Sequence, residues 1–287
     1  MTTLENKIDF AIVFHVKNAN PNGDPLNGNR PRTDYGGFGE ITDVCLKRKI
    51  RDRLMESDKA IFVQSDDRKK DKCTSLADRA RTVLGEKLGG PETATLACQT
   101  WFDVRAFGQL FAIKAEKKKA KKKDEAAIET ESAGDSGISI GIRGPVTIQS
   151  AFSIDPVSLT STQITKSVSG EGDGSKRGSD TMGMKHRVDQ GIYVSYGSIS
   201  PQLAERTGFS ANDAEAIKMV LPKIFENDAS SARPDGSMEV MKVIWWQHDS
   251  KAGKCSSAKV HRSLTVSPTG DITLADIGLT PEIIEGF

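Results

Sequence analysis

The stretch that organises this chain is Asn18–Arg53, which reads NANPNGDPLNGNRPRTDYGGFGE and then ITDVCLKRKIRDR. The first part is a long loop rich in Asn, Gly, Pro, Asp and Arg. It follows an apolar run at residues 7–16 that predicts a central strand buried on both faces. The second part predicts a helix whose polar side is almost wholly basic. A strand that ends in a donor-rich loop and continues into a cationic helix suits the binding of a chain of phosphates.

The loop at 18–40 is too long to be a simple connection, and loops of this length in compact domains are usually functional or disordered. Its glycines permit positive φ and close backbone approach. Its asparagines and arginines supply donors for phosphate and ribose oxygens. On residue types alone, the alternative is a mobile surface loop.

The predicted helix has two separate faces. Thr42 is a suitable N-cap and Asp43 suits the first turn, so the helix is expected to begin here. One face is an apolar stripe that anchors the helix, formed by Leu46, Ile50 and Leu54. A second sector is basic and free to meet an anion, formed by Lys47, Arg48 and Arg51. A solvated basic face is the alternative for that sector.

The rest of the chain mixes helix and strand patterns. Helical spacing marks 74–87, 93–113 and 212–227. Strand patterns mark 60–63, 139–154, 191–200 and 238–247, and we expect 260–266 to pair with the last of these. These elements lack a doubly wound rhythm. We therefore predict an α+β class, with one antiparallel sheet that carries helices and two long insertions. The length allows one elaborated domain or two small ones.

The first insertion contains a lysine-rich segment. Residues 114–123 hold seven lysines in ten positions, and acidic and small residues follow up to position 137. This composition predicts a flexible segment. A solvated tether and a weak nucleic-acid contact are the two interpretations.

The second insertion, at 158–190, predicts an extended hairpin arm, because two β-capable flanks enclose a Gly- and Ser-rich middle. The arm carries Met182, Met184, Lys185 and Arg187. A soft apolar side chain on an exposed arm can wedge between stacked bases while neighbouring cations hold phosphates. Alternatively, the methionines fill a gap between the arm and its own body.

Several classes of function are disfavoured. No P-loop, no H-x-x-x-H or H-E-x-x-H spacing and no G-x-S-x-G elbow occurs, so we predict no cofactor and no metal. Four cysteines without a C-x-x-C pair fit reduced thiols. No signal peptide or run of about 20 apolar residues is visible, so we expect a cytoplasmic protein with no membrane partner.

Charge is distributed unevenly along the chain, although the formal net charge is only +1. The loop and helix at the front are basic. Residues 269–287 carry four acidic residues and no Lys or Arg. This asymmetry is consistent with head-to-tail contact between copies, and a solvated acidic terminus is the alternative.

Two aspartates lie in the basic loop, Asp24 in GDPLNG and Asp34 in RTDYGG. A carboxylate at either position could hold Mg²⁺ or orient a ribose 2′-hydroxyl for RNA cleavage, which would make the protein a metal-dependent ribonuclease. The alternative is that these side chains cap turns or pair with Arg30 or Arg32.

Three motifs in order, namely NANPNGDPLNGNRPRTDYGGFGEITDVCLKRKIRD, WFDVRAFG and GIRGPVTIQSAFSIDPV, closely resemble the type I-C CRISPR Cascade backbone subunit. This subunit belongs to the Csd/Csh group of Cas-seven proteins in the RAMP superfamily. The resemblance implies a single modified RRM-like (ferredoxin-like) domain over 1–287. It implies a finger-like insertion at 60–137 and a protruding β-hairpin thumb at 158–190. Several copies would then line one CRISPR RNA in a head-to-tail helical filament, and each thumb would kink the RNA.

The resemblance also implies roles for particular residues. The RNA backbone would contact Asn20, Asn22, Arg30, Arg32, Lys47, Arg48, Arg51, Lys185 and Arg187. Met182 or Met184 would be the thumb wedge. Asp24 and Asp34 would be structural and the subunit non-catalytic, because type I complexes delegate DNA cutting to a recruited helicase-nuclease. Further implied partners are the target DNA strand, a subunit that binds the 5′ handle, and a large subunit.

Overall fold

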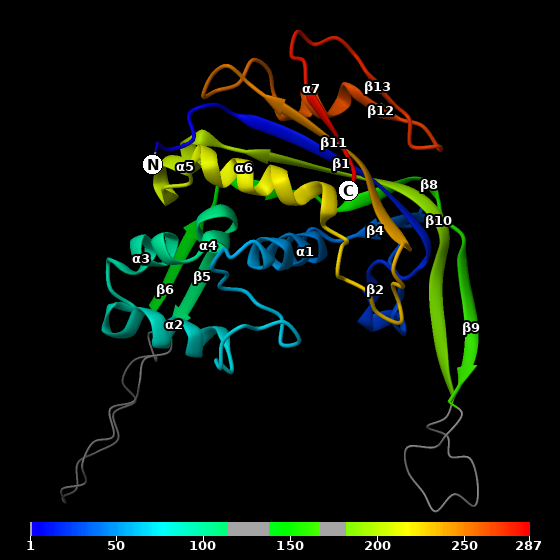
Figure 1. The fold of residues 1–287 in the computed structure, drawn as a ribbon, viewed down its shortest axis with the longest axis horizontal. Helices are drawn as coiled ribbons and strands as arrows, with labels where there is room; N and C mark the ends of the chain where they lie inside the picture. The colour runs from blue at the N-terminus through cyan, green and yellow to red at the C-terminus, as the bar shows by residue number, and fades with distance from the viewer. Residues whose placement is uncertain (1, 114–137, 167–181) are drawn as a thin grey trace, which may run out of the picture.

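A computed structural model describes residues 2–113, 138–166 and 182–287. Its centre is an antiparallel sheet with the strand order β14-β11-β1-β10-β8-β4, while β7 and β9 pair with other parts of β10 (Figure 1). The strands of this sheet are β1 (Ile8–Ala19), β4 (Phe38–Ile41), β7 (Val146–Ile148), β8 (Ala151–Pro156), β9 (Leu159–Thr165), β10 (Met182–Ile199), β11 (Met238–Gln247) and β14 (Glu282–Glu285). The structure thus confirms the predicted mixture of helices with one large antiparallel sheet.

Strand β1 is buried on both faces, as its continuous apolarity predicted. It lies between β10 and β11. Phe10 and Ile12 belong to the core on one side of the sheet. Ala11 and Val13, which point the other way, belong to a second core on the opposite side.

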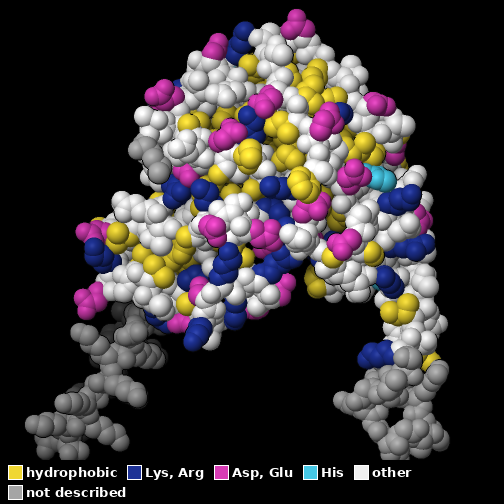
Figure 2. All heavy atoms as spheres, viewed as in Figure 1, with side chains coloured by type: hydrophobic (Ala, Val, Ile, Leu, Met, Phe, Trp, Pro, Cys, Tyr) yellow, Lys and Arg dark blue, Asp and Glu magenta, His cyan; other side chains and the backbone are white. Residues whose placement is uncertain are grey.

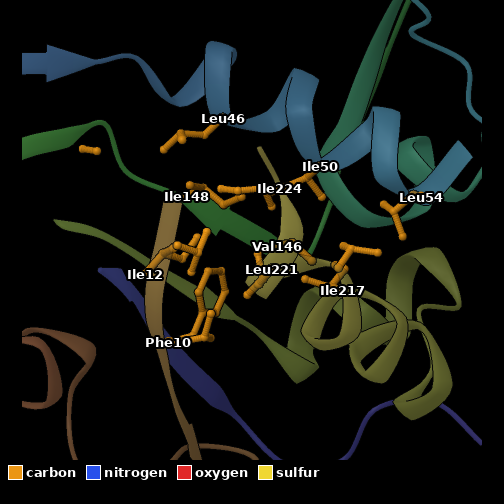
Figure 3. Packing of buried hydrophobic residues seen from close by; sticks show 14 of the residues in the cluster. Phe10, Ile12, Leu46, Ile50, Leu54, Val146, Ile148, Ile217, Leu221 and Ile224 are labelled. Carbon is orange, nitrogen blue, oxygen red and sulfur yellow. The ribbon is translucent and has the colours of Figure 1, made fainter. Parts of the chain in front are cut away.

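Helices cover the first side of the sheet. They are α1 (Asp43–Glu56), α5 (Pro201–Thr207), α6 (Ala211–Val220) and the short 3₁₀ helix η4 (Leu221–Lys223). The α1 stripe of Leu46, Ile50 and Leu54 is fully buried, as predicted, and it faces Phe10 and residues of α6 and η4 (Figure 3). Each such side chain stabilises the fold by roughly 1.5–3 kcal/mol. This packing fixes which side of α1 remains available to a ligand.

The C-terminal segment covers the second side of the sheet. It contains α7 (Ser257–Arg262), β12 (Leu264–Val266) and β13 (Ile272–Leu274). Val260 and Leu264 pack against Trp246 of β11. The prediction that 260–266 pairs with β11 is wrong, because β1 and β14 already occupy both edges of β11. Strand β12 pairs with β13 instead.

A lobe beside the sheet contains α2 (Leu76–Leu84), the 3₁₀ helix η2 (Gly85–Lys87), α3 (Thr93–Thr100), α4 (Phe102–Phe107), β5 (Gly108–Ile113) and β6 (Ile138–Arg143). It has a small core of its own, in which Phe62, Trp101 and Phe111 make ring contacts. The predicted strand at 60–63 is absent. The lysine-rich 114–123 stretch lies outside the described residues.

The predicted helix over 93–113 is two short helices in the structure, α3 and α4, separated by the extended backbone of Trp101, and Gly108 ends the second of them. Gly108 has φ of 81°, and a Cβ there would lie 2.3 Å from the backbone oxygen of Ile142. The chain therefore turns into β5, which pairs with β6.

The predicted helix at 212–227 also ends early, at Val220, where η4 with its Pro222 follows. At its start, Ser210 and Asp213 form a reciprocal capping box.

The acidic C-terminal segment is built into the sheet. Strand β14 pairs with β11, and Glu282 and Glu285 each place a carboxylate oxygen 2.6 Å from a lysine Nζ, of Lys218 and Lys242 respectively. Intramolecular ion pairs therefore engage two of the four acidic residues of this segment. Among the described residues, no helix has both the length and the apolarity needed to cross a bilayer.

Candidate nucleic-acid interface

The long loop after β1 is held in shape by its own asparagines. It contains the short strands β2 (Gly23–Asp24) and β3 (Arg30–Pro31), with the 3₁₀ helix η1 (Pro25–Asn27) between them. Asn20 is 3% exposed, and its side-chain amide donates to the backbone oxygen of Asn29 at 2.7 Å. Asn22 Oδ1 accepts from both the backbone N–H and the hydroxyl of Thr42 at 3.0 Å.

These contacts give the two asparagines structural roles, and their predicted contacts with RNA stay predictions. Asn20 is too buried to present its amide to RNA in this conformation, and it closes the β2–β3 loop. Asn22 ties that loop to the first turn of α1. Both side chains therefore shape the surface around them.

The two loop aspartates act as turn caps. Asp24 Oδ1 accepts from the backbone N–H of Leu26 at 3.2 Å and lies 3.3 Å from Nη2 of Arg32. Asp34 Oδ1 accepts from the N–H groups of Gly36 and Phe38 at 2.8 and 2.9 Å. Both observations match the capping alternative weighed for these residues. No group of three or more His, Cys, Asp or Glu side chains suited to a metal ion occurs within the described ranges.

The basic side of α1 is less uniform than its sequence suggested. Lys47 Nζ lies 3.0 Å from Asp43 one turn earlier, at the surface. Arg48 is about one-third exposed and reaches the carboxylates of Asp52 and Asp228, each at 3.4 Å. In the loop, Arg30 is exposed and Arg32 is partly exposed. These cations remain available to a polyanion at the surface.

Arg51 departs from the predicted basic sector. Its side chain is 12% exposed, its Nε donates to Asp103 Oδ2 at 2.9 Å, and its guanidinium lies 5.1 Å from the ring centroid of Phe107. Asp103 also accepts from the backbone N–H groups of Phe62 and Val63. Arg51 therefore joins α1 to the neighbouring lobe, and its predicted contact with RNA stays a prediction.

A buried cluster that sequence analysis missed lies at the inner edge of this surface. Asp228, in the segment that follows η4, accepts from the ammonium of Lys49, which is 1% exposed. Arg233 Nε also donates to Asp228, at 3.0 Å. Burial alone would raise the pKa of Asp228, but Lys49, Arg233 and Arg48 together lower it below its usual value. The cluster fixes α1 to the segment at 226–237 and brings Arg233 next to Arg48.

Nothing local in the sequence identifies this cluster. Lys49 and Asp228 are separated by 179 positions. The only available signal was that Lys49 lies one position before Ile50, near the edge of the apolar stripe, where a lysine needs a buried counter-ion.

The 158–190 arm contains a protruding antiparallel hairpin of β9 and the first part of β10, and residues 167–181 lie outside the described range (Figure 1). Lys and Arg side chains lie along it next to apolar ones (Figure 2). The regular register from Met182↔Thr165 to Val188↔Leu159 assigns each side chain to a face. Met182 and Met184 share one face with Val188, whereas Lys185 and Arg187 point to the other.

Val188, at the root of this face, packs into the core on the α1 side of the sheet, whereas Ile192 and Val194 further along β10 pack into the opposite core. Met182 and Met184 are 65% and 55% exposed, so they do not fill a gap against the body in the described structure. Lys185 is exposed, and Arg187 Nε lies 3.5 Å from Asp189. The apolar and cationic parts of the arm therefore face opposite directions, as the two-residue period of a strand requires for even- and odd-numbered positions.

The open surface of this protein is not the face of its sheet. In a simple RNA-binding sheet of this kind, the face opposite the helices is open and stacks bases. Here α7, β12 and β13 cover it. The loop after β1, the outer side of α1 and the hairpin remain, and together they have the features expected of a nucleic-acid-binding protein.

Comparison with known proteins identifies the family. Residues 6–278 match the family model described as CRISPR-associated protein Cas7. The chain is 32% identical over 247 residues to the CRISPR-associated protein Cas7 of Haloferax volcanii, covering 80% of this chain and 67% of that protein. This chain belongs to the Cas7 family of CRISPR-associated proteins.

The chain is also similar to chains of solved structures, two of which are described below. A CRISPR RNA-guided surveillance complex in a pre-nicking state matches with a TM-score of 0.44 and 14% identity, covering 84% of this chain and 78% of the matched chain. A second CRISPR RNA-guided surveillance complex matches with a TM-score of 0.41 and 14% identity, covering 84% and 68%. Likeness at these TM-scores is too slight to support an inference about this chain.

Proposed function

We propose that this chain is a non-catalytic, CRISPR RNA-binding backbone subunit of a type I-C surveillance complex. The observation that carries the proposal is the Cas7 family match over nearly the whole chain. Several copies would assemble head to tail along the RNA in the cytoplasm and present it for pairing with a target DNA strand. Complex partners would be a 5′-handle-binding subunit, a large subunit and a recruited helicase-nuclease.

The fold is compatible with an RRM-like palm. Strands β11, β1, β10 and β8 lie side by side in that order. In chain order they alternate with α1 and α6 as β-α-β-β-α-β, which is the ferredoxin-like arrangement. We assign the lobe of α2–α4, β5 and β6 as the finger-like insertion, and the β9–β10 hairpin as the thumb.

The surface chemistry suits a protein that holds any guide sequence. Such a protein must contact phosphates and 2′-hydroxyls in preference to base edges, and base pairing then reads the sequence. Arg30, Lys47 and Arg48 are cations at the surface of the loop and α1, and Arg233 extends this group beyond the residues that the sequence indicated. Met182 and Met184 are exposed on one face of the hairpin and suit a wedge between bases.

The proposal is tested by stoichiometry. The chain would be co-expressed with its partner subunits and CRISPR RNAs of increasing length, and native mass spectrometry would count copies per RNA. We expect the number of copies to rise stepwise with RNA length. A single copy on every RNA length would refute a backbone role.

The location of the interface is tested by charge reversal. We expect Arg30→Glu with Lys47→Glu to weaken RNA binding by roughly tenfold, because two cations at the surface become anions. The matched control, Lys259→Glu with Arg262→Glu on α7, makes the same charge change on the covered side of the sheet and should have little effect. Equal losses of RNA affinity in the two double variants would mean that binding depends on the net charge of the chain and not on this surface.

The ribonuclease alternative has its own test. The assembled protein would be incubated with complementary RNA and Mg²⁺. Cleavage that is lost in Asp24→Asn or Asp34→Asn would replace the scaffold proposal with a catalytic one. We expect no cleavage, because both carboxylates are engaged in capping turns.

A further inference from the structure

One large aromatic side chain in the loop has no structural partner that explains its position. Tyr35 lies at the tip of a tight reversal in which Thr33 forms a bridge with Gly39 and the N–H of Asp34 donates to the oxygen of Phe38 at 2.9 Å. Its side chain is fully exposed. Burial of the ring therefore contributes nothing to the stability of the isolated chain.

The tip is ordered without help from the tyrosine ring. Asp34 Oδ1 accepts two backbone N–H groups inside the turn. Gly37 has φ of 82°, and its N–H donates to the backbone oxygen of Asp34 at 3.2 Å. The backbone is thus fixed by the aspartate and the glycines, and the ring is held out into solvent.

The tip also has a definite place in the molecule. The backbone oxygen of Gly37 accepts from the N–H of Val157 at 2.9 Å, and Phe38 pairs with Pro156 of β8. Leu159, where the protruding hairpin starts, is two residues after Val157. Tyr35 therefore stands at the foot of the hairpin, at the end of the loop that carries Arg30 and Arg32.

We propose that Tyr35 is a stacking platform for one base of the bound single-stranded RNA, a role that rests on the proposed function. Proteins that hold single strands without sequence preference combine cations for the backbone with aromatic rings on which bases stack. Tyr35 is an exposed ring in the same loop as Arg30 and Arg32, at the foot of an arm with exposed methionines, and it supplies an aromatic group of this kind. Asp34 would then hold the backbone turn that presents the Tyr35 ring.

The experiment measures binding of the full chain to labelled single-stranded RNA, with Tyr35→Ala and Tyr35→Phe as variants. We expect Tyr35→Ala to weaken binding by roughly 5- to 150-fold, the range for loss of one base–aromatic stack. Tyr35→Phe keeps the ring and should bind like the unmodified chain. Because the ring is exposed, the melting temperature should not change in either variant.

A second RNA isolates stacking from other losses. In an oligonucleotide with abasic internal positions, the ring has no base to stack on, so Tyr35→Ala and the unmodified chain should bind equally. Leu26→Ala is the matched control, because Leu26 is another almost fully exposed apolar side chain of the same loop. We expect it to change RNA affinity little.

The outcomes separate this inference from the proposed function. If the unmodified chain and Tyr35→Ala bind RNA equally well, the stacking role is overturned. It is also overturned if Tyr35→Ala loses as much affinity for abasic RNA as for normal RNA. If Leu26→Ala and Tyr35→Ala both lose only multi-copy assembly, the loop contacts a neighbouring copy and not a base. If the unmodified chain fails to bind RNA at all, the proposed function fails and the stacking role with it.

Discussion

Replacing Asp228 with alanine is expected to destabilise the protein strongly. The Asp228 side chain is 6% exposed and is shared by Lys49, Arg48 and Arg233. Arg48 and Arg233 keep 35% and 23% of their side-chain surface exposed, so they can turn to water. Lys49, at 1% exposed, cannot, and its remaining neighbour is the ring of Phe225 at 5.5 Å.

The magnitude follows from leaving that ammonium buried without a counter-ion. Removal of one partner of a buried ion pair costs about 3–5 kcal/mol. For a domain of this size, that corresponds to a fall in melting temperature of roughly 6–20 °C. Adding Lys49→Met to Asp228→Ala removes the uncompensated charge, so the double variant should be more stable than Asp228→Ala alone.

The assay is urea unfolding followed by tryptophan fluorescence, with Asp235→Ala as the control. Asp235 lies in the same segment but is exposed, so we expect its replacement to change the free energy of unfolding by no more than about 0.5 kcal/mol. If Asp228→Ala and Asp235→Ala lower the free energy of unfolding equally, the buried ion pair is not what holds α1 to this segment. The same follows if adding Lys49→Met to Asp228→Ala restores none of the lost stability.

The same cluster predicts a pH dependence. The pKa of Asp228 is lower in the folded protein than the ordinary value of 3.8. Its stabilising contribution is therefore fully present above that value and is lost as the pH falls through the lower, folded-state pKa. The stability difference between the unmodified chain and Asp228→Asn should be largest near neutral pH and should shrink below pH 3.8. A difference that stays constant into strong acid would contradict the assignment.

Three further outcomes follow from the geometry. Arg51→Gln should lower the free energy of unfolding by about 1.5–3 kcal/mol in a denaturant titration, because its charged hydrogen bond to Asp103 is lost, whereas Lys47→Gln should be nearly neutral. RNA binding would also be titrated at several salt concentrations. Lys185→Gln with Arg187→Gln should reduce the slope of log K against log salt by about 1.4. Met182→Ser with Met184→Ser should weaken RNA binding and leave that slope unchanged. Burial raises the pKa of Cys98 to about 11, so a thiol reagent at pH 8 should label it only after unfolding; rapid labelling of the native protein would show that the small core of the lobe opens.

Local chemistry was enough to predict several elements from the sequence. The apolar run at 7–16 gave a strand buried on both faces, and Thr42 gave the start of α1. The apolar stripe of α1 and the bounds of β11 at Met238–Gln247 also agree with the structure. In each case the signal is a periodicity or a cap within one segment, which needs no knowledge of distant residues.

Predictions failed where a distant segment decided the outcome. The predicted helix over 93–113 breaks at Trp101, and its second part ends at Phe107 because the backbone at Gly108 meets the backbone of Ile142. Residues 260–266 could not pair with β11 because β14, from the end of the chain, already held that edge. Propensity is a weak prior, and tertiary contacts override it.

The sequence by itself determined the family, through three motifs in order, and it determined which residue types gather in the loop, α1 and the hairpin arm. Only the tertiary structure decided which of those side chains are free. It buried Asn20 and turned Arg51 toward Asp103. The physical reason is that composition and periodicity are local, whereas burial and ion pairing depend on segments far apart in the chain, as Lys49 and Asp228 are.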